Sequence, residues 1–267
     1  MGASVALVLG AGGQFGFAHI GVLKVLEEEA LVPDLIVGSS IGSVVGALWA
    51  AGAGADFLAR LGQEMRRSQW ADVRLHRLGL LAGERMEGLM RLLLRDRELQ
   101  SLVPRVVVVA TDIQDGERVV IDRGPAAQAI RASASVPGLF APLRWQGRLL
   151  VDGAVTERLP VRTAREQGAD RILAVSLDPL RAKRVAPVTS LVDVVLRSFD
   201  ILQREVTRQG ATDADLVIEP DLTVGAGAHR DRVHRLVAAG HEAAAAQRRA
   251  IRELFGRQVG EARTGAS

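Results

Sequence analysis

The chain has 267 residues, 48% of them apolar, with 34 Lys and Arg against 31 Asp and Glu, which excludes a disordered or collagen-like protein. The pI of about 10.3 is high because cysteine and tyrosine are absent and only two lysines occur, so few groups titrate above neutrality. It gives little support for nucleic-acid binding, and the absence of cysteine excludes disulfides, zinc–thiolate sites and thiol nucleophiles.

The first fifty residues contain the same pattern twice. A strand (residues 4–9), a glycine cluster (10–16) and a helix (17–29) are followed by a strand (33–37), a turn (38–42) and a helix (43–51). Residues 1–23 and 35–55 carry no formal charge, but both are rich in glycine, and the first lacks the positive start of a signal peptide. We expect a cytoplasmic protein that does not span a membrane, with peripheral membrane contact left open.

The rest of the chain alternates between helical and strand patterns. A charged helical insertion is expected over about 55–99, with breaks near Gly79 and Gly83, and a hairpin turn at Gln146-Gly147. Strands are expected at 106–110, 118–121, 148–152, 171–177 and 215–219, and helices at 188–208 and about 230–255. This order predicts a single three-layer α/β/α domain over 1–267, with a mostly parallel central sheet.

The strongest chemical motif is Gly38-Ser39-Ser40-Ile41-Gly42, a G-x-S-x-G between a predicted strand and a predicted helix. In a nucleophile elbow the serine occupies a sharp turn, and the flanking glycines remove side chains that would collide. The N-terminus of the following helix would favour the oxyanion formed on attack. A simple Gly/Ser turn from strand to helix is the alternative.

An activated serine needs a base. None of the five histidines is expected in a late strand-end loop, where a Ser-Asp-His triad would need it: His19 is predicted inside the first helix, and the others in charged helical surroundings (His76, His229, His234, His241). Asp152 ends a predicted strand and precedes Gly153, which suits a carboxylate presented on a tight turn. A purely turn-forming Asp-Gly pair is the alternative.

The glycine cluster at 10–16 could bring backbone N–H groups onto a phosphate or a reaction oxyanion. A dinucleotide site is the main rival. The Rossmann spacing fails because Phe15 occupies the third glycine position, and Asp34 precedes the second strand instead of ending it. The oxyanion interpretation gains because the cluster and Ser40 would come from adjacent strand ends.

In their order, the glycine loop, G-x-S-x-G and Asp152-Gly153-Ala154 resemble the patatin-like phospholipase family, and specifically its compact bacterial members. The stretches 19–27, 131–142 and 238–244 also match, so the resemblance runs from about Val5 to Leu254. It implies a metal-free and cofactor-free Ser-Asp dyad enzyme that hydrolyses acyl ester bonds of lipids. Ser40 would be the nucleophile, Asp152 the base, and the N–H groups of Gly12 and Gly13 the oxyanion hole, supported by the motif glycines (Gly10, Gly16, Gly38, Gly42, Gly153).

Two departures leave specificity open. A basic residue commonly stands in the family where this chain has Phe15, and Ala11 replaces a usual glycine. Phe15 would pack under the loop or line an acyl channel. The expected substrates are phospholipids or lysophospholipids, with a general carboxylesterase or thioesterase and a non-catalytic acyl- or anion-binding protein as alternatives. The oligomeric state stays open.

Two further segments could contact membranes. In the 55–99 insertion, methionines and a tryptophan would form a lid beside the site or, as we favour, a cap packed on the domain (Met65, Trp70, Met86, Met90). Arginines of the terminal helix could meet anionic lipid, but their spacing favours an ordinary solvated face (Arg230, Arg232, Arg235, Arg248, Arg249, Arg252).

Overall fold

The computed structural model describes residues 3–76, 78–178, 188–189, 191–224 and 228–256. Its eight-stranded sheet has the order β10-β9-β1-β2-β5-β8-β7, with β6 paired to β5, and β3 and β4 form a separate hairpin. The first five strands in this order are parallel, whereas β6 and β8 each pair antiparallel with β5, and β7 pairs antiparallel with β8. The strands are β1 (Val5–Leu9), β2 (Leu35–Ser39), β3 (Val73–His76), β4 (Gly79–Leu81), β5 (Arg105–Asp112), β6 (Arg118–Ile121), β7 (Leu143–Trp145), β8 (Arg148–Asp152), β9 (Arg171–Val175) and β10 (Leu216–Ile218).

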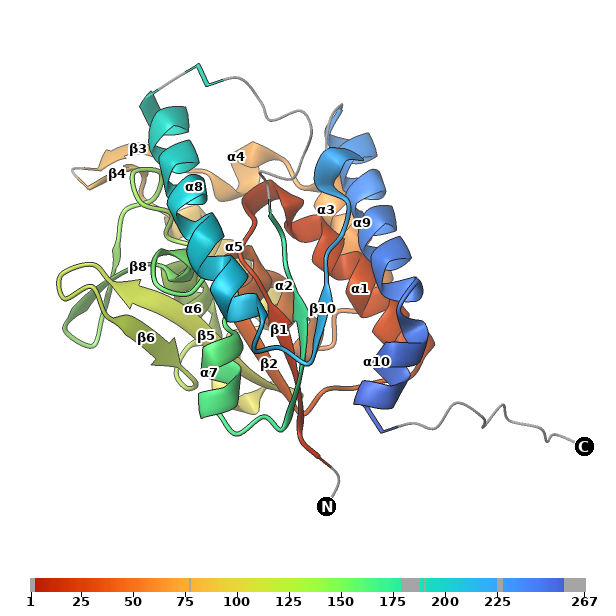
Figure 1. Cartoon of the computed structure of the whole chain (residues 1–267). Coiled ribbons are helices and arrows are strands. Elements are labelled where there is room, and N and C mark those ends of the chain that lie inside the picture. The colour runs from red at the N-terminus through yellow and green to blue at the C-terminus, as the bar shows by residue number, and fades with distance from the viewer. Residues whose placement is uncertain (1–2, 77, 179–187, 190, 225–227, 257–267) are drawn as a thin grey trace, which may run out of the picture.

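Helices cover both faces of this sheet (Figure 1), so the predicted three-layer α/β/α architecture is confirmed. α1, α2, α9 and α10 belong to one layer, and α7 and α8 lie on the opposite side. The helices are α1 (Phe17–Glu28), α2 (Ile41–Ala50), α3 (Ala55–Glu64), α4 (Arg67–Trp70), α5 (Glu84–Leu94), α6 (Ala126–Ser133), α7 (Val161–Glu166), α8 (Leu191–Ala211), α9 (His229–Ala245) and α10 (Arg248–Leu254).

The two uncharged stretches are explained by burial on both faces of the sheet. Along β1, Leu7 and Leu9 join the larger core beneath α1 and α2, whereas Ala6 and Val8 join the second core beneath α7. A strand covered on both faces needs apolar residues at every position instead of alternating ones. The strands within these stretches therefore lack charge because they lie at the centre of a parallel sheet.

The strand register places two chain segments at one point of the sheet. β2 pairs with β5 so that Ser39 lies opposite Val109, and Ser40 follows directly. β8 enters antiparallel from the carboxyl edge of β5, and its last residue, Asp152, pairs with Ala110. The ends of β2 and β8 therefore lie at the same level of the sheet, on the two sides of β5.

Several sequence-based predictions need correction. The 55–99 insertion is not helical throughout, because short segments pair as the antiparallel β3–β4 hairpin, which places His76 on a strand. The expected terminal helix is two helices, α9 and α10, separated at Ala246-Gln247. The second helix begins at Ile41, directly after Ser40. The short helices α6 and α7 were not expected.

Candidate active site

Ser40 occupies a strained turn between β2 and α2. Its φ of 52° and ψ of −124° lie where a residue with a side chain is rarely found, at a cost of about 1–3 kcal/mol. The flanking glycines allow this turn to pack closely: a Cβ on Gly42 would stand 2.0 Å from the Leu9 carbonyl oxygen, and one on Gly38 would stand 2.5 Å from Ser43 Cα. Such a turn presents the serine at the start of a helix, as a nucleophile elbow does.

Three hydrogen bonds that involve side chains hold Ser40 in this conformation. Its hydroxyl donates to Asp152 Oδ2 at 2.6 Å, and its backbone N–H donates to Ser133 Oγ at 2.8 Å. The Ser43 hydroxyl donates to the Ser40 carbonyl at 2.6 Å. Because the Ser40 N–H already has an acceptor, it is not free to donate to a developing oxyanion.

Asp152 is a buried carboxylate, with 2% of its surface exposed. Burial raises its pKa from 3.8 to about 6, against the opposing effects of the Ser40 hydroxyl, the Ala154 N–H and the charge of Arg158. The Ala154 N–H donates to Asp152 Oδ1 at 2.8 Å, which orients Oδ2 toward Ser40. The carboxyl can therefore accept a proton near neutral pH.

The glycine loop lies beside this pair. The N–H groups of Gly10 and Ala11 bond to the carbonyls of Val175 and Arg158, at 3.1 and 2.9 Å. Those of Gly12 and Gly13 find no acceptor among the described residues. The loop also touches the elbow, because a Cβ on Gly16 would stand 2.1 Å from Ile41 Cγ1. Gly153 is equally confined, with a Cβ there 2.2 Å from the Val109 carbonyl oxygen.

None of the histidines whose side chains the structure describes reaches the site as a base; the His76 side chain lies outside the described part. His19 is fully buried in α1, and its Nε2 bonds to the Gly10 carbonyl at 2.8 Å. Burial lowers its pKa to about 4, so the ring is neutral and Nε2–H is the donor. His19 therefore has a structural role: it lies beneath the glycine loop and holds the Gly10 carbonyl. The other described histidine side chains bond elsewhere or face solvent: His229 to Gly62, His241 to Glu28, and His234 exposed.

Two serines and an arginine at the end of α6 support the site, and sequence reasoning assigned them no role. Besides Ser133, Ser135 accepts the Asp152 N–H on its carbonyl at 2.9 Å. The buried Arg131 donates to Ser135 Oγ and to the carbonyls of Ala82, Gly83 and Ala141 (Ala82 at 2.7 Å, Gly83 at 3.1 Å, Ala141 at 2.8 Å). At the level of sequence, the stretch 131–142 supported only the family resemblance. Its serines and arginine were the signal that could have indicated a supporting role.

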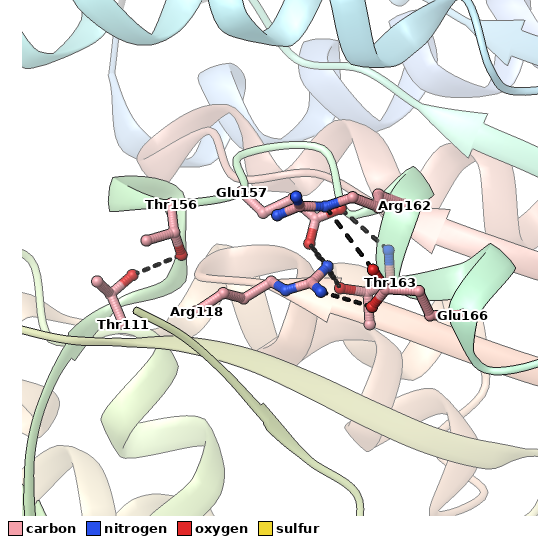
Figure 2. A network of polar contacts seen from close by, with 7 residues as sticks. All are labelled: Thr111, Arg118, Thr156, Glu157, Arg162, Thr163 and Glu166. Carbon is pink, nitrogen blue, oxygen red and sulfur yellow. Dashed lines mark hydrogen bonds and ion pairs between the residues drawn. The ribbon is translucent and has the colours of Figure 1, made fainter. Parts of the chain in front are cut away.

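A second polar network holds the chain just after Asp152 (Figure 2). Arg118 on β6 donates to Glu157 at 2.9 Å and to the Thr163 hydroxyl at 2.8 Å, and Glu157 also accepts the Thr163 N–H. Thr111 Oγ1 donates to the Asp152 carbonyl at 3.0 Å and lies 2.9 Å from Thr156 Oγ1. The backbone of Asp152 and the residues that follow it are therefore both held by hydrogen bonds.

The other residues singled out from the sequence lie outside the Ser40–Asp152 pair and have packing or strand-end roles. Phe15 is half-buried and packs partly against the larger core. Asp34 accepts the Val5 N–H at 2.8 Å, at the opposite end of β2 from Ser40, which removes the support for a dinucleotide site. Met86 and Met90 are buried, as expected for a packed cap.

Neither metal ligands nor a membrane span were found in the described part of the chain. No three His, Asp or Glu side chains gather there in a way that could hold a metal ion. Likewise, none of the helices within those residues is both long and apolar enough to cross a bilayer.

Comparison with known proteins gives a consistent result. The family model for patatin-like phospholipase matches residues 7–165. An NTE family protein of Mycobacterium tuberculosis is 38% identical over 176 residues, covering 65% of this chain and 49% of that protein. Patatin-like phospholipase domain-containing protein 6 of Homo sapiens is 33% identical over 184 residues, covering 66% of this chain and 13% of that protein. The chain therefore spans about half the length of the mycobacterial relative, and less of the human one.

Two solved structures share the fold. VipD from Legionella pneumophila superposes with a TM-score of 0.62 and 12% identity, over 95% of this chain and 67% of VipD. The type III effector ExoU of Pseudomonas aeruginosa gives 0.52 and 14%, over 93% of this chain and 53% of that one. Because the family model matches more than half of the residues, in the region that carries the glycine loop, Ser40 and Asp152, this chain belongs to the patatin-like phospholipase family.

Proposed function

We propose that this protein is a serine acyl hydrolase that cleaves carboxylic ester bonds of lipids, with Ser40 as nucleophile and Asp152 as base. The single observation that carries the proposal is the 2.6 Å hydrogen bond from the Ser40 hydroxyl to a buried carboxylate. Membership of the patatin-like phospholipase family supports the lipid ester as substrate. The names of two relatives, a phospholipase domain protein and a lysophospholipase, point the same way.

The reaction follows from the positions of the groups. Ser40 Oγ attacks the ester carbonyl carbon while its proton passes to Asp152 Oδ2, and the carbonyl oxygen becomes an oxyanion. The carbon–oxygen bond to the leaving alcohol then breaks, and Asp152 returns the proton to that alcohol. A water molecule, deprotonated by Asp152, attacks the acyl–Ser40 ester, and the carboxylic acid leaves as Ser40 regains its proton.

The N–H groups of Gly12 and Gly13 are the donors that we assign to the oxyanion. They lack acceptors among the described residues, and the Gly16–Ile41 contact holds their loop against the elbow. One donor of this kind contributes about 3–4 kcal/mol of transition-state stabilisation. Such stabilisation is important here because a carboxylate is a weaker base than the imidazole of a triad.

The raised pKa of Asp152 makes the carboxylate a better base. A general base works best when its pKa lies near the operating pH, and burial brings Asp152 from 3.8 to about 6. The same burial keeps water away from the proton that moves between Ser40 and Asp152, since only 6% of Ser40 is exposed. These features favour hydrolysis over the non-catalytic binding alternative, for which neither a strained serine nor a buried base is needed.

A serine-directed fluorophosphonate probe and a p-nitrophenyl ester series test the proposal. Wild-type protein should be labelled at Ser40 and should hydrolyse medium-chain esters. Ser40→Ala should lose both activities, and the exposed Ser68→Ala serves as the matched control that keeps them. Folded protein that is neither labelled nor active would favour an acyl- or anion-binding protein, and full activity in Ser40→Ala would disprove the dyad.

Substrate class needs a separate measurement. We propose phospholipid or lysophospholipid as substrate, because both occur in the names of relatives. Intact phospholipid, lysophospholipid, triacylglycerol and an acyl thioester should be offered in mixed micelles, and the released fatty acid quantified by mass spectrometry. Preference for the thioester or for a small soluble ester would identify a thioesterase or a general carboxylesterase.

A further inference from the structure

Arg158 is a buried cation in the segment that follows Asp152, and 7% of its surface is exposed. A buried charge is stable only when it is paired and hydrogen-bonded. Its partner is Asp200 on α8, because Arg158 Nη1 donates to Asp200 Oδ1 at 2.9 Å. α8 lies on the same side of the sheet as α7 (Figure 1), so a helix distant in the chain fixes this guanidinium.

The same residue contacts the glycine loop from behind. Arg158 Nη2 donates to the Leu177 carbonyl at 3.3 Å. The Leu177 side chain packs against Gly12, where a Cβ would stand 2.8 Å from Leu177 Cβ. The Arg158 carbonyl accepts the Ala11 N–H at 2.9 Å. The side chain and the backbone of Arg158 therefore both support the loop that carries the Gly12 and Gly13 N–H groups.

The positive charge of Arg158 also acts on the proposed base. Burial raises the pKa of Asp152 to about 6, and the charge of Arg158 is among the influences that oppose this rise. When Ser40 attacks an ester, its proton neutralises the carboxylate and the negative charge appears on the oxyanion. The site therefore carries a negative charge before and after this step, and a fixed cation nearby favours both states.

The other charged groups around Arg158 and Asp152 have contacts of their own. These contacts join Arg204 to Asp178, Arg118 to Glu157, Arg131 to Ser135 and to backbone carbonyls, and Asp112 to the Gln114 N–H. Arg197 precedes Asp200 by one turn of α8 and also interacts within the protein. The charges of Arg158 and Asp200 can therefore be changed without removing any of these groups.

We propose that Arg158 is a positioning residue of the Ser40–Asp152 site: held by Asp200 on α8, its guanidinium supports Gly12 through Leu177 and places a positive charge near the base. The proposal rests on the proposed function, since the reaction that Arg158 serves is the hydrolysis assigned to Ser40 and Asp152. Arg158 acts through Leu177 and through its charge, not on the ester itself.

Two opposite changes of charge separate this role from a purely structural one. Arg158→Met removes the cation, so the acid limb of kcat/KM for a neutral ester should move to higher pH by about half a unit. Asp200→Asn removes the neighbouring negative charge but keeps an acceptor oxygen for Arg158, so the limb should move to lower pH. Arg165→Met is the matched control: Arg165 also joins an ion pair, with Asp215, to a bond with a backbone carbonyl, and the limb should stay in place.

A change that keeps the charge tests the contact with Leu177. Arg158→Lys retains a cation, but an ammonium group lacks the planar fork with which Arg158 reaches Asp200 and the Leu177 carbonyl together. The acid limb should therefore stay near its wild-type position. kcat should fall several-fold while KM for a p-nitrophenyl ester changes less than about twofold, because the Gly12 donor acts in the transition state. If Arg158→Met fails to fold, Arg158→Lys and Asp200→Asn still test the proposal.

Thermal unfolding follows the Asp152 proton without any hydrolysis. The Tm difference between a protein and its Asp152→Asn counterpart changes with pH as Asp152 ionises. The midpoint of that change should move to higher pH when Arg158→Met is added to both proteins, and to lower pH when Asp200→Asn is added. Such shifts in a protein whose wild type hydrolyses no ester would support the coupling of Arg158 to Asp152 and refute the proposed function.

Four results would overturn the positioning role of Arg158. They are acid limbs and midpoints that stay in place in both charge variants, shifts of the same sign in both, an equal shift in Arg165→Met, and an unchanged kcat in Arg158→Lys. Hydrolysis by the wild type together with any of these results would leave the proposed function standing and remove only the role of Arg158.

Discussion

Replacing Asp152 by Asn should abolish hydrolysis while making the folded protein more stable near neutral pH. The amide has nearly the shape of the carboxyl group. Its oxygen can still accept the Ala154 N–H, and its nitrogen can donate to Ser40 Oγ, so both hydrogen bonds keep a counterpart. What is lost is the buried negative charge and the ability to take a proton.

The magnitude follows from the shifted pKa. Folding raises the pKa of Asp152 from 3.8 to about 6, and each unit of difference corresponds to about 1.4 kcal/mol. Because the folded protein binds this proton more tightly, the stabilising effect is fully present below pH 3.8 and is lost as pH rises through 6. Above pH 7 the ionised carboxylate costs about 3 kcal/mol, and the Asn variant avoids that cost.

Thermal unfolding of wild type and Asp152→Asn across pH 4 to 8 measures the effect. The difference in Tm should be small at pH 4, grow between pH 4 and 6, and reach about 6–12 °C above pH 7, from roughly 2–4 °C per kcal/mol for a domain of this size. Asp112→Asn is the control, because Asp112 is also buried at the end of a neighbouring strand but has no contact with Ser40. A pH-independent difference, or a less stable Asp152→Asn protein at pH 8, would refute the linkage between burial and ionisation.

Three further outcomes are expected around the same site. For a neutral ester, kcat/KM should fall about tenfold per pH unit below pH 6 as Asp152 takes up a proton; a rate that is flat down to pH 4.5 would contradict Asp152 as base. Ser133→Ala should reduce stability by about 1–3 kcal/mol in urea unfolding, because the buried Ser40 N–H loses its acceptor, and kcat should fall more than KM changes. Arg131→Ala should cost at least about 3 kcal/mol in the same assay, because Ser135 and several backbone carbonyls lose their donor; a loss below 1 kcal/mol would refute this.

The parts that could be predicted from sequence are those whose signal is local. β1 and β2 are apolar runs of the right length, each followed by glycines and a helical pattern, so strand, turn and helix were recognised in order. Gln146 and Gly147 both adopt positive φ, of 47° and 82°, as the expected hairpin turn between β7 and β8 requires. These features depend on neighbours in the chain and need no tertiary contact.

The parts that could not be predicted depend on distant residues. The β3–β4 hairpin pairs short, partly charged segments, and Leu81 also bridges to Phe140, so its signal lies in contacts made after folding. The side of α8 that faces the domain also depends on distant residues, because Arg158 and Asp178 form ion pairs with its Asp200 and Arg204. Amphipathic spacing shows that a helix has two faces, but its own sequence does not say which one the domain holds.

The two buried titratable groups near Ser40 have different consequences for the enzyme, although burial shifts both of them toward their neutral forms. His19 has its pKa lowered to about 4, so it stays neutral and holds the Gly10 carbonyl in the same way throughout the working range of pH. Asp152 has its pKa raised to about 6, so it alone changes charge there. The loop that carries the Gly12 N–H should therefore keep one geometry while the base is switched on. The acid limb of the pH–rate profile should accordingly show the loss of a single proton, and a second proton would mean that the His19–Gly10 contact also titrates.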